Sequence, residues 1–359
     1  MAAIHQFVAG FTNGDAISNE ARAMRALFRS WGFESEIFCE TRRILPELRH
    51  EAREVAGYPP ACRPDDIVLL HLSIGSAVND IFAGLNCRKA LLYHNITPAG
   101  YFDVINRQTA LDLARGREQM RALAGAAAVN LADSRFNADE LARIGYRDVQ
   151  VLPLMLDFNL ILTPPDRKTL RRFSDGCVNV LFVGRCAPNK KIEDALLAFY
   201  YFHRFVEPRS RFIHAGSFAG TERYYALVLS QARELGLSNV FFAGAVTQAQ
   251  LSAFYRAAHV FLCMSEHEGF CIPIVESMAH GLPVMAYAAG AVPETMDGAG
   301  ILFREKRYDW IAEMMGKLVR DAELRAAVVR RQQDRLTRFR QQNLGTALRQ
   351  RLSPLIGGQ

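Results

Sequence analysis

The sequence predicts an α/β protein of two domains, each built on a parallel β-sheet. Short apolar runs alternate with helix-like patterns along the 359 residues, which is typical of parallel strands joined by crossover helices. A chain of this length fits about two domains, and a proline-containing polar segment near its middle predicts the boundary between them. Half of the residues are hydrophobic, which is sufficient for a full-sized core.

In the first half, apolar runs predict strands at residues 5–8, 36–39, 67–71, 90–94, 128–131 and 149–152. A helical pattern over residues 16–31 ends at Gly32, a common residue just beyond a helix C-terminus. A linker is predicted over residues 163–176, where Pro164, Pro165 and Gly176 interrupt regular structure. We therefore expect the first domain to span residues 1–165.

The second half repeats this pattern. Strands are predicted at residues 178–183, 211–214, 240–243, 259–262 and 284–287, and helices at residues 192–205 and 221–235. The second domain is expected over residues 175–335. A polar helical pattern runs from residue 321 to about residue 352, and residues 336–359 are expected to form a C-terminal helix and tail.

The distribution of charge limits which partners this chain is expected to bind. The net charge is +6, and the excess lies late in the chain, at Arg330, Arg331, Arg335, Arg338, Arg340, Arg349 and Arg351. We interpret these as a solvated helix face; contact with an acidic membrane surface is the functional alternative. Nucleic acid is not an expected partner, because a single-strand binder needs a series of aromatic residues among its basic ones.

The cysteines and apolar runs indicate the compartment. The seven cysteines are scattered, without the paired spacing of a zinc site, which favours free thiols in a reducing cytosol. There is no apolar run of membrane-spanning length, and residues 1–8 read as a strand rather than a signal peptide. A cytoplasmic location is therefore expected, with peripheral membrane association as the open alternative.

The most informative segment follows the strand at residues 259–262. Glu268 and Glu276 have seven residues between them, one before a helix and one inside it. Pro273 suits the first helical turn, and Gly281 and Pro283 end the helix. A helix N-terminus binds anions, and carboxylates accept hydrogen bonds from hydroxyls. Phosphate plus hydroxyls is the chemistry of a nucleotide sugar.

A second loop, after the strand at residues 178–183, supplies cations. Gly184 permits a tight turn, and Arg185 and Lys190 follow at the carboxyl end of the sheet, where open α/β sheets bind ligands. Two cations there could neutralise a diphosphate; the alternative is a pair of surface cations. The loop lacks the spacing of a phosphate-binding Walker motif.

The segment of residues 265–286 resembles the donor-site motif of the family-four retaining glycosyltransferases, which have the two-domain GT-B fold. The resemblance covers nearly the whole chain and is densest over residues 183–303. It implies two Rossmann-like domains facing a central cleft, with the last helix crossing back to the first domain.

The resemblance also implies roles for individual residues. It assigns Arg185 and Lys190 to the leaving diphosphate, Glu268 to a donor-sugar hydroxyl, Glu276 to the ribose, and the Val246 backbone to the base. It further assigns the sugar's 6-hydroxyl to His94, sugar and phosphate contacts to the backbone of Gly269, Phe270, Cys271 and Ile272, and the loop shaping the diphosphate and acceptor site to Gly14 and Asp15.

Three of these assignments have alternatives or departures. His94 could be an ordinary strand-end residue, and Asp15 could bind an acceptor hydroxyl or cap the following helix. The family usually has two glycines in the loop that here reads Asn13-Gly14-Asp15. Cys271 stands where the family commonly has glycine, which places a side chain close to the expected donor.

The implied activity is transfer of a hexose from a GDP- or UDP-sugar to a glycan or lipid-linked acceptor, forming an α-glycoside in surface polysaccharide synthesis. No metal or other cofactor is expected, because cationic side chains and a helix N-terminus supply the charge. A nucleotide-sugar epimerase of the same fold and a non-catalytic nucleotide-sugar binding protein are the alternatives, since fold alone does not decide function.

Overall fold

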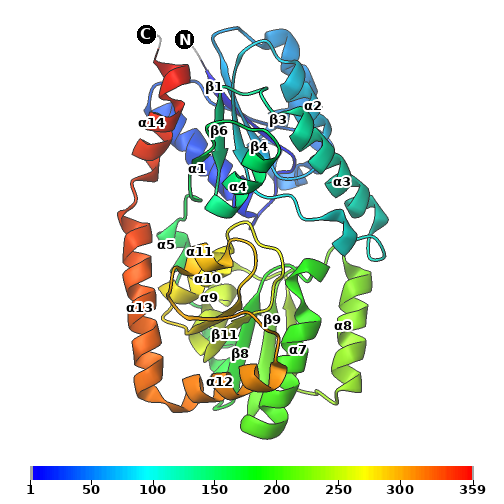
Figure 1. The fold of residues 1–359 in the computed structure, drawn as a ribbon, viewed down its shortest axis with the longest axis vertical. Helices are drawn as coiled ribbons and strands as arrows, with labels where there is room; N and C mark the ends of the chain where they lie inside the picture. The colour runs from blue at the N-terminus through cyan, green and yellow to red at the C-terminus, as the bar shows by residue number, and fades with distance from the viewer. Residues whose placement is uncertain (1–2, 358–359) are drawn as a thin grey trace. The chain divides into compact units, whose positions relative to one another are not determined.

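The computed structural model describes residues 3–357 and divides the chain into two compact units (Figure 1). Unit 1 comprises Met1–Asp103, Arg107–Leu156 and Asn343–Gln359. Unit 2 comprises Val104–Asn106 and Asp157–Gln342. The chain thus enters unit 2 after Leu156 and returns to unit 1 at Asn343.

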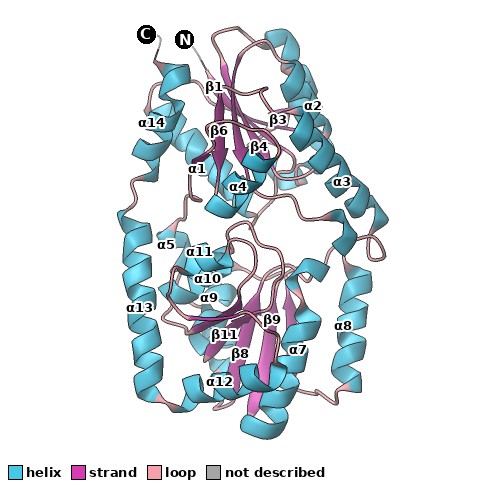
Figure 2. Cartoon of the chain, viewed as in Figure 1, coloured by secondary structure: helices cyan, strands magenta, loops and turns pink. Residues whose placement is uncertain are grey.

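Unit 1 is built on a parallel sheet of seven strands in the order β3-β2-β1-β4-β5-β6-β7 (Figure 2). The strands are β1 (Ile4–Val8), β2 (Ile37–Cys39), β3 (Arg53–Glu54), β4 (Ile67–Leu72), β5 (Arg88–Tyr93), β6 (Val129–Ala132) and β7 (Gln150–Val151). In the central pair, Ile4 of β1 lies opposite Ile67 of β4 and Val8 lies opposite His71. Strands β1 and β4 are buried along their whole length, as expected of central parallel strands.

Helices cover this sheet and complete its core. They are α1 (Ala16–Ser30), α2 (Ala77–Gly84), α3 (Arg107–Ala122), α4 (Arg135–Arg143) and α14 (Leu344–Ile356). The last of these contacts β5 and β6. Its residues Leu348, Leu352 and Leu355 are buried in one cluster with strand residues such as Leu69 and Leu92. The end of the chain is therefore part of the unit 1 core.

Unit 2 has a parallel sheet of six strands in the order β10-β9-β8-β11-β12-β13 (Figure 2). Its strands are β8 (Val178–Val183), β9 (Ser210–Ala215), β10 (Val240–Gly244), β11 (Val260–Cys263), β12 (Val284–Tyr287) and β13 (Ile301–Phe303). Its helices are α5 (Phe158–Ile161), α6 (Arg167–Phe173), α7 (Ile192–Tyr201), α8 (Glu222–Glu234), α9 (Gln248–Ala257), α10 (Ile272–Ala279), α11 (Val292–Met296), α12 (Tyr308–Arg320) and α13 (Ala322–Gln341). A π-helical turn, Phe202–Val206, extends α7.

Most predicted elements are present within one or two residues of their expected bounds. The runs at residues 178–183 and 284–287 match β8 and β12 fully. The predicted helix from residue 321 to residue 352 is wrong as one element, because it divides into α13 and α14. The break has a local cause: the Asn343 side chain accepts a hydrogen bond from the Thr346 N–H at 2.9 Å and caps a new helix.

The division into units differs from the expected boundaries at residues 165 and 336. Asp166 caps α6 by accepting from the Thr169 N–H at 2.7 Å, and its own N–H donates to the Ala249 carbonyl. The predicted linker therefore contains a helix that packs within unit 2, against α9. Compact packing, rather than proline content, places the division near Leu156.

Part of the basic C-terminal segment is used inside unit 2. Arg335 donates to the backbone carbonyls of Thr295 and Glu294, and both Arg335 and Arg338 lie within ion-pair distance of Asp297. These contacts tie α13 to the α11 region. Among residues 3–357, no helix combines the length and the apolarity needed to cross a membrane.

Candidate functional site

The candidate site in unit 2 starts at two neighbouring strands. β8 and β11 are paired in parallel, so the loops that follow them leave the same edge of the sheet. The β8 loop carries Gly184, Arg185 and Lys190, and the β11 loop carries Glu268. The structure thus brings the two most specific motifs of the sequence to one sheet edge.

Hydrogen bonds join the two loops directly. The Glu266 N–H donates to the Asn189 carbonyl at 2.9 Å, and the Asn189 side chain donates to the His267 carbonyl at 3.2 Å. Asn189 is only 5% exposed, so these bonds lie in the interior. Sequence reasoning did not single out Asn189, although it lies next to the predicted Lys190.

Lys190 and Glu268 form the central ion pair of the site. The Lys190 Nζ atom lies 2.6 Å from Glu268 Oε2, and the two side chains are 22% and 9% exposed. Burial lowers the pKa of Lys190, but the charge and hydrogen bond of Glu268, together with the nearby Cys271 and Cys263, raise it, and the net shift is upward. The lysine therefore stays charged. In this structure Lys190, which was predicted to contact the diphosphate, and Glu268, which was predicted to contact the sugar, bind each other.

Arg185 is held at the start of the same loop. Its guanidinium donates to the Ala219 carbonyl at 3.1 Å, while the residue remains exposed. The turn before it depends on Gly216, since a Cβ there would lie 1.9 Å from the Gly184 carbonyl oxygen. The end of β9 can thus approach the Gly184 turn closely, and this fixes where Arg185 leaves the sheet.

Glu276 lies on α10 and has a buried partner. The Tyr255 hydroxyl donates to Glu276 Oε2 at 2.6 Å. Burial raises the pKa of Glu276, and the Tyr255 hydrogen bond offsets only part of this. One of the two Glu276 carboxylate oxygens thus already accepts a hydrogen bond from within the protein. Tyr255 was not identified from the sequence.

The residues between the two glutamates form the end of the loop and the first turn of α10. Phe270 is buried against Phe339, and the Thr295 hydroxyl donates to the Phe270 carbonyl. Gly269 and Ile272 are half-buried. Val246, assigned to the base, follows β10 and is also half-buried.

Cys271 is the N-cap of α10 and has a left-handed backbone, with φ 70° and ψ 66°. This conformation favours glycine and costs a side-chain-bearing residue about 1–2 kcal/mol, which gives a physical reason for glycine at this position in the resembled family. The Cys271 thiol is buried, and its Sγ lies within 4.8 Å of the Cys263 Sγ at the end of β11. The interaction of the two thiols raises the pKa of Cys271 and lowers that of Cys263.

The Glu268 backbone packs closely against Gly290, in the connection between β12 and α11. A Cβ at Gly290 would lie 2.4 Å from the Glu268 carbonyl oxygen, and the Ala291 N–H donates to that same oxygen at 3.0 Å. Gly290 also has φ +57°. The connection between β12 and α11 therefore fixes the position of the Glu268 backbone.

In unit 1, the glycine loop after β1 has a clear structural role. Gly14 has φ +71°, and Asp15 is the N-cap of α1. Asp15 Oδ2 accepts from the Ser18 N–H at 2.9 Å and from the Ser18 hydroxyl at 2.8 Å. Of the two roles left open for Asp15, the helix cap is the one observed.

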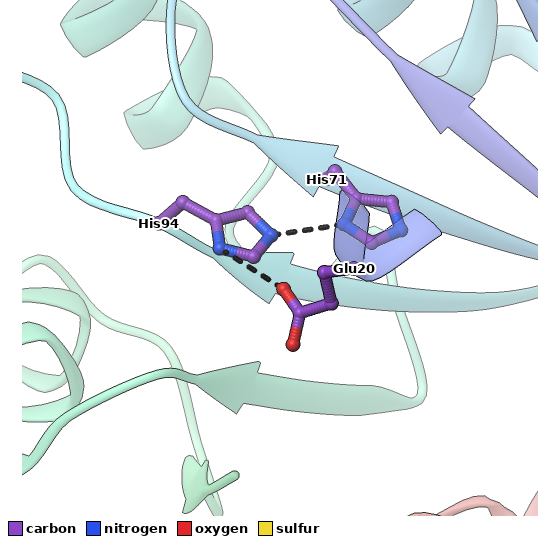
Figure 3. A group of neighbouring side chains, drawn as sticks. All are labelled: Glu20, His71 and His94. Atoms are coloured by element: carbon purple, nitrogen blue, oxygen red, sulfur yellow. Dashed lines mark hydrogen bonds and ion pairs between the residues drawn. The ribbon is translucent and has the colours of Figure 1, made fainter. Parts of the chain in front are cut away.

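His94 follows β5 and lies inside a polar network of unit 1 (Figure 3). Gln6 donates its amide N–H to the Ala21 carbonyl, which turns its oxygen toward His71 Nε2 at 3.0 Å. An amide oxygen only accepts, so His71 Nε2 carries the hydrogen. Burial holds the pKa of His71 well below its usual range, so the ring is neutral and its Nδ1 accepts. We therefore assign the proton shared at 2.9 Å to His94 Nε2.

The other ring nitrogen of His94 faces two carboxylates. His94 Nδ1 lies 3.6 Å from Glu20 Oε2 and 3.5 Å from Asp133 Oδ2, and all three side chains are at most 3% exposed. Burial lowers the pKa of His94, but Asp133 and Glu20 together raise it above its ordinary value. Burial raises the pKa of Glu20 to about 7. His94 Nε2 thus has a hydrogen-bond partner in His71, whereas Nδ1 makes no hydrogen bond and only faces the two carboxylates at ion-pair distance.

Two groups have the spacing to hold a metal ion among the described residues. They are Glu20, His71 and His94 in unit 1, and Cys263, Glu268 and Cys271 in unit 2, each with ligand atoms within 4.8 Å of one another. In the first group, the closest pair of ring nitrogens is already joined by a hydrogen bond. The second group surrounds the Lys190–Glu268 pair.

Comparison with known proteins gives one family and several relatives. Residues 172–335 match the family described as glycosyl transferases group 1. A D-inositol 3-phosphate glycosyltransferase of Acidothermus cellulolyticus is 36% identical over 44% of this chain and 36% of its own length. An O-antigen chain mannosyltransferase B of Escherichia coli is 28% identical over 46% of this chain and 43% of its own length. The aligned part thus spans less than half of either relative.

A solved structure extends the likeness to the whole fold. The HepE protein of Anabaena, in complex with UDP and glucose, superposes with a TM-score of 0.74 over 100% of both chains at 18% identity. Such low identity shows the fold alone, which is the GT-B arrangement of two Rossmann-like domains. The predicted fold class and the predicted resemblance to group 1 glycosyltransferases are confirmed.

Proposed function

We propose that this chain, whose residues 172–335 form a group 1 glycosyltransferase domain, is a retaining hexosyltransferase that uses a nucleotide diphosphate sugar. The donor would be a GDP- or UDP-sugar, and the acceptor a glycan or lipid-linked sugar in cytoplasmic assembly of a surface polysaccharide. The mannosyl and inositol phosphate activities named for the relatives, and the UDP bound by the Anabaena protein, support this donor class.

One observation carries the proposal: a half-buried lysine and a buried glutamate meet where two parallel strands end. Lys190 and Glu268 are 2.6 Å apart, and Arg185 leaves the same loop as Lys190. In the proposed complex, the two cations take the diphosphate, and Glu268 accepts from a sugar hydroxyl. Each charge-assisted hydrogen bond of this kind contributes about 1.5–3 kcal/mol.

Catalysis in this proposal rests on positioning and charge. The sugar's C1–O bond to the diphosphate breaks, the acceptor oxygen attacks from the same face, and the leaving phosphate oxygen takes the acceptor proton. Arg185 and Lys190 stabilise the charge that grows on the diphosphate. We assign His94 to the network of unit 1 rather than to the sugar, because its Nε2 is hydrogen-bonded to His71 and its Nδ1 faces the buried Glu20 and Asp133 carboxylates.

The two glutamates provide the sharpest test. We expect Glu276→Ala to weaken binding of the free nucleoside diphosphate, because the proposal gives Glu276 the ribose. Glu268→Ala should leave that affinity nearly unchanged and impair turnover of the intact donor. Calorimetry with UDP and GDP on both variants, followed by turnover assays, checks this; equal losses of nucleoside diphosphate affinity would reject the assignment.

The metal expectation has its own test. Because Arg185 and Lys190 supply the positive charge, turnover should survive saturating EDTA. Complete loss of activity that Mg²⁺ or Mn²⁺ restores would show that the leaving group needs a metal ion.

Two other functions predict different product patterns. An epimerase would release free nucleotide without any added acceptor, and a non-catalytic binding protein would bind donor without turnover. A transferase should release nucleotide in proportion to acceptor added. Chromatography of nucleotide and sugar products with and without acceptor separates the three.

A further inference from the structure

Two thiols and a carboxylate converge beside the Lys190–Glu268 pair. The Sγ atoms of Cys263 and Cys271 and a carboxylate oxygen of Glu268 all lie within 4.8 Å of one another. Cys263 ends β11, and Cys271 caps the helix that follows, so one short connection carries all three groups. The three residues are 0%, 7% and 7% exposed.

This ligand set has a defined chemical preference. Thiolates select borderline and soft cations such as Zn²⁺, whereas Mg²⁺ and Mn²⁺ prefer oxygen ligands. Zn–S bonds are about 2.3 Å long, so two thiolates of a tetrahedral site lie roughly 3.8 Å apart. The two Sγ atoms lie within 4.8 Å of each other, so the thiols need to approach by at most about 1 Å to reach that value. A fourth position would be open to water, as at zinc sites with three protein ligands.

The surrounding charges also fit a dication. With neutral thiols, the Lys190 and Glu268 charges cancel. Binding of a dication releases two thiol protons to solvent, and the resulting two thiolates cancel the added charge. Glu268 has two oxygens, so Oε2 can keep its bond to Lys190 while Oε1 meets the ion. The ion can approach from the side of Lys190, whose side chain is 22% exposed.

We propose that Cys263, Glu268 and Cys271 form a site for a thiophilic divalent cation of the Zn²⁺ class. Metal coordination would fix the Glu268 carboxylate and draw it away from other ligands. If the proposed glycosyl transfer holds, the bound ion inhibits it by withdrawing Glu268 from the donor sugar. The binding itself does not depend on that function.

Cadmium titration of the full-length protein tests the site directly. Under a phosphine reductant, Cd²⁺ should add ultraviolet thiolate-to-cadmium charge-transfer absorbance that saturates at one equivalent, and Zn²⁺ should remove it by competition. Cys271→Gly should abolish the band. Glycine suits the left-handed backbone at position 271, so this variant should fold. Glu268→Gln should keep the band but weaken Cd²⁺ affinity at least tenfold.

A second thiol pair provides the matched control. Cys62 lies close enough to Cys87 in unit 1 to raise the pKa of Cys87, and the two thiols could bind Cd²⁺ on their own. Cys62→Ser should therefore leave the one-equivalent band unchanged. A band that survives Cys271→Gly, that disappears in Cys62→Ser, or that is absent from the wild type would overturn the proposal. These outcomes are read without any glycosyl transfer, so they are distinct from failure of the proposed function.

Discussion

The Lys190–Glu268 ion pair is expected to contribute to the stability of the protein as well as to turnover. Removal of one member of a buried pair leaves the other charge without a partner and costs about 3–5 kcal/mol. Lys190 is 22% exposed, which favours the lower end of that range. We therefore expect Lys190→Ala to lower stability as well as turnover, contrary to the simpler expectation that only turnover suffers.

The double variant separates the two effects. In Lys190→Ala with Glu268→Gln, no charge is left unpaired, so part of the stability should return, with a coupling of about 1–3 kcal/mol. Urea unfolding of the wild type, both single variants and the double variant measures this coupling. Strictly additive losses would mean that the pair contributes nothing beyond its separate side chains.

Glu20 predicts a pH-dependent stability of unit 1. Its pKa is about 7 in the folded protein against an ordinary value of 4.5, so the folded state holds one more proton between these values. Stability from this group is therefore present at pH 5 and is lost as the pH rises through 7, by on the order of 3 kcal/mol in total. The pKa shifts of His94 and Asp133 are also upward and act in the same direction.

A comparison with Glu20→Gln isolates this contribution. The depressed pKa of His71 acts with the opposite sign below its ordinary value of 6.5, so the wild-type profile alone mixes the two effects. The stability of Glu20→Gln relative to wild type should instead rise from pH 5 and level off above about pH 7, where Glu20 is ionised in both the folded and the unfolded state. Denaturant unfolding from pH 5 to pH 8 measures the difference, and a difference independent of pH would show that Glu20 is ionised throughout.

At the residue scale, the sequence pointed to side chains in local motifs and missed those that meet over long distances. Glu268 and Lys190 were predicted because each follows a strand that the apolar pattern identifies. Glu20 lies on α1 and His71 near the end of β4, and nothing in the local pattern shows that they converge on His94 (Figure 3). Buried polar networks of this kind depend on tertiary packing.

At the scale of elements, a glycine between β12 and α11 supports the Glu268 loop. Gly290→Ala would place a Cβ 2.4 Å from the Glu268 carbonyl oxygen, so this loop or its neighbour must move. Gly298→Ala provides the control: its φ is also positive, +77°, but no atom lies within 4 Å of its Cβ position. Both variants should lose about 1–2 kcal/mol from backbone strain.

The two glycine variants should differ in ligand binding. Only Gly290→Ala displaces the loop that the proposal assigns to the donor sugar, so it alone should weaken nucleotide-sugar affinity, by tenfold or more. Thermal shift with UDP-glucose and GDP-mannose, using whichever binds the wild type, measures both variants. Equal affinities would show that the loop tolerates the change or lies outside the donor site.

The predicted elements show which physical signals are visible in sequence. Buried parallel strands such as β8 are nearly continuous apolar runs, interrupted there only by Asn179, and β8 was predicted to the residue. β3 is Arg53–Glu54, two exposed charged residues without an apolar run. β13 has only three residues, Ile301–Phe303, and was not predicted. The break between α13 and α14 depends on one capping side chain, Asn343, within a continuous polar helical pattern.

At the scale of the whole molecule, alternation of strands and helices predicted two parallel sheets, but not where the chain passes between units. Proline content suggested a boundary that α6 occupies. Three residues, Val104–Asn106, belong to unit 2 although their neighbours on both sides belong to unit 1. Asn106 donates to the Gly220 carbonyl at 2.8 Å, a contact between residues 114 positions apart that local patterns cannot indicate.

The two units should also respond separately to core mutations. Leu352 of α14 is fully buried in unit 1, and Leu336 of α13 is 1% exposed in unit 2. Each leucine-to-alanine change should cost about 2–5 kcal/mol. In segment-resolved hydrogen exchange, Leu352→Ala should lower protection of β4 and β5 and leave β8 and β11 unchanged, and Leu336→Ala should do the reverse. Because every donor-site residue retained in the proposal lies in unit 2, Leu352→Ala should also keep the wild-type nucleotide-sugar affinity. Equal loss of protection in both units for both variants would show that the chain unfolds as one cooperative body, and donor affinity could not then be assigned to unit 2 by this route.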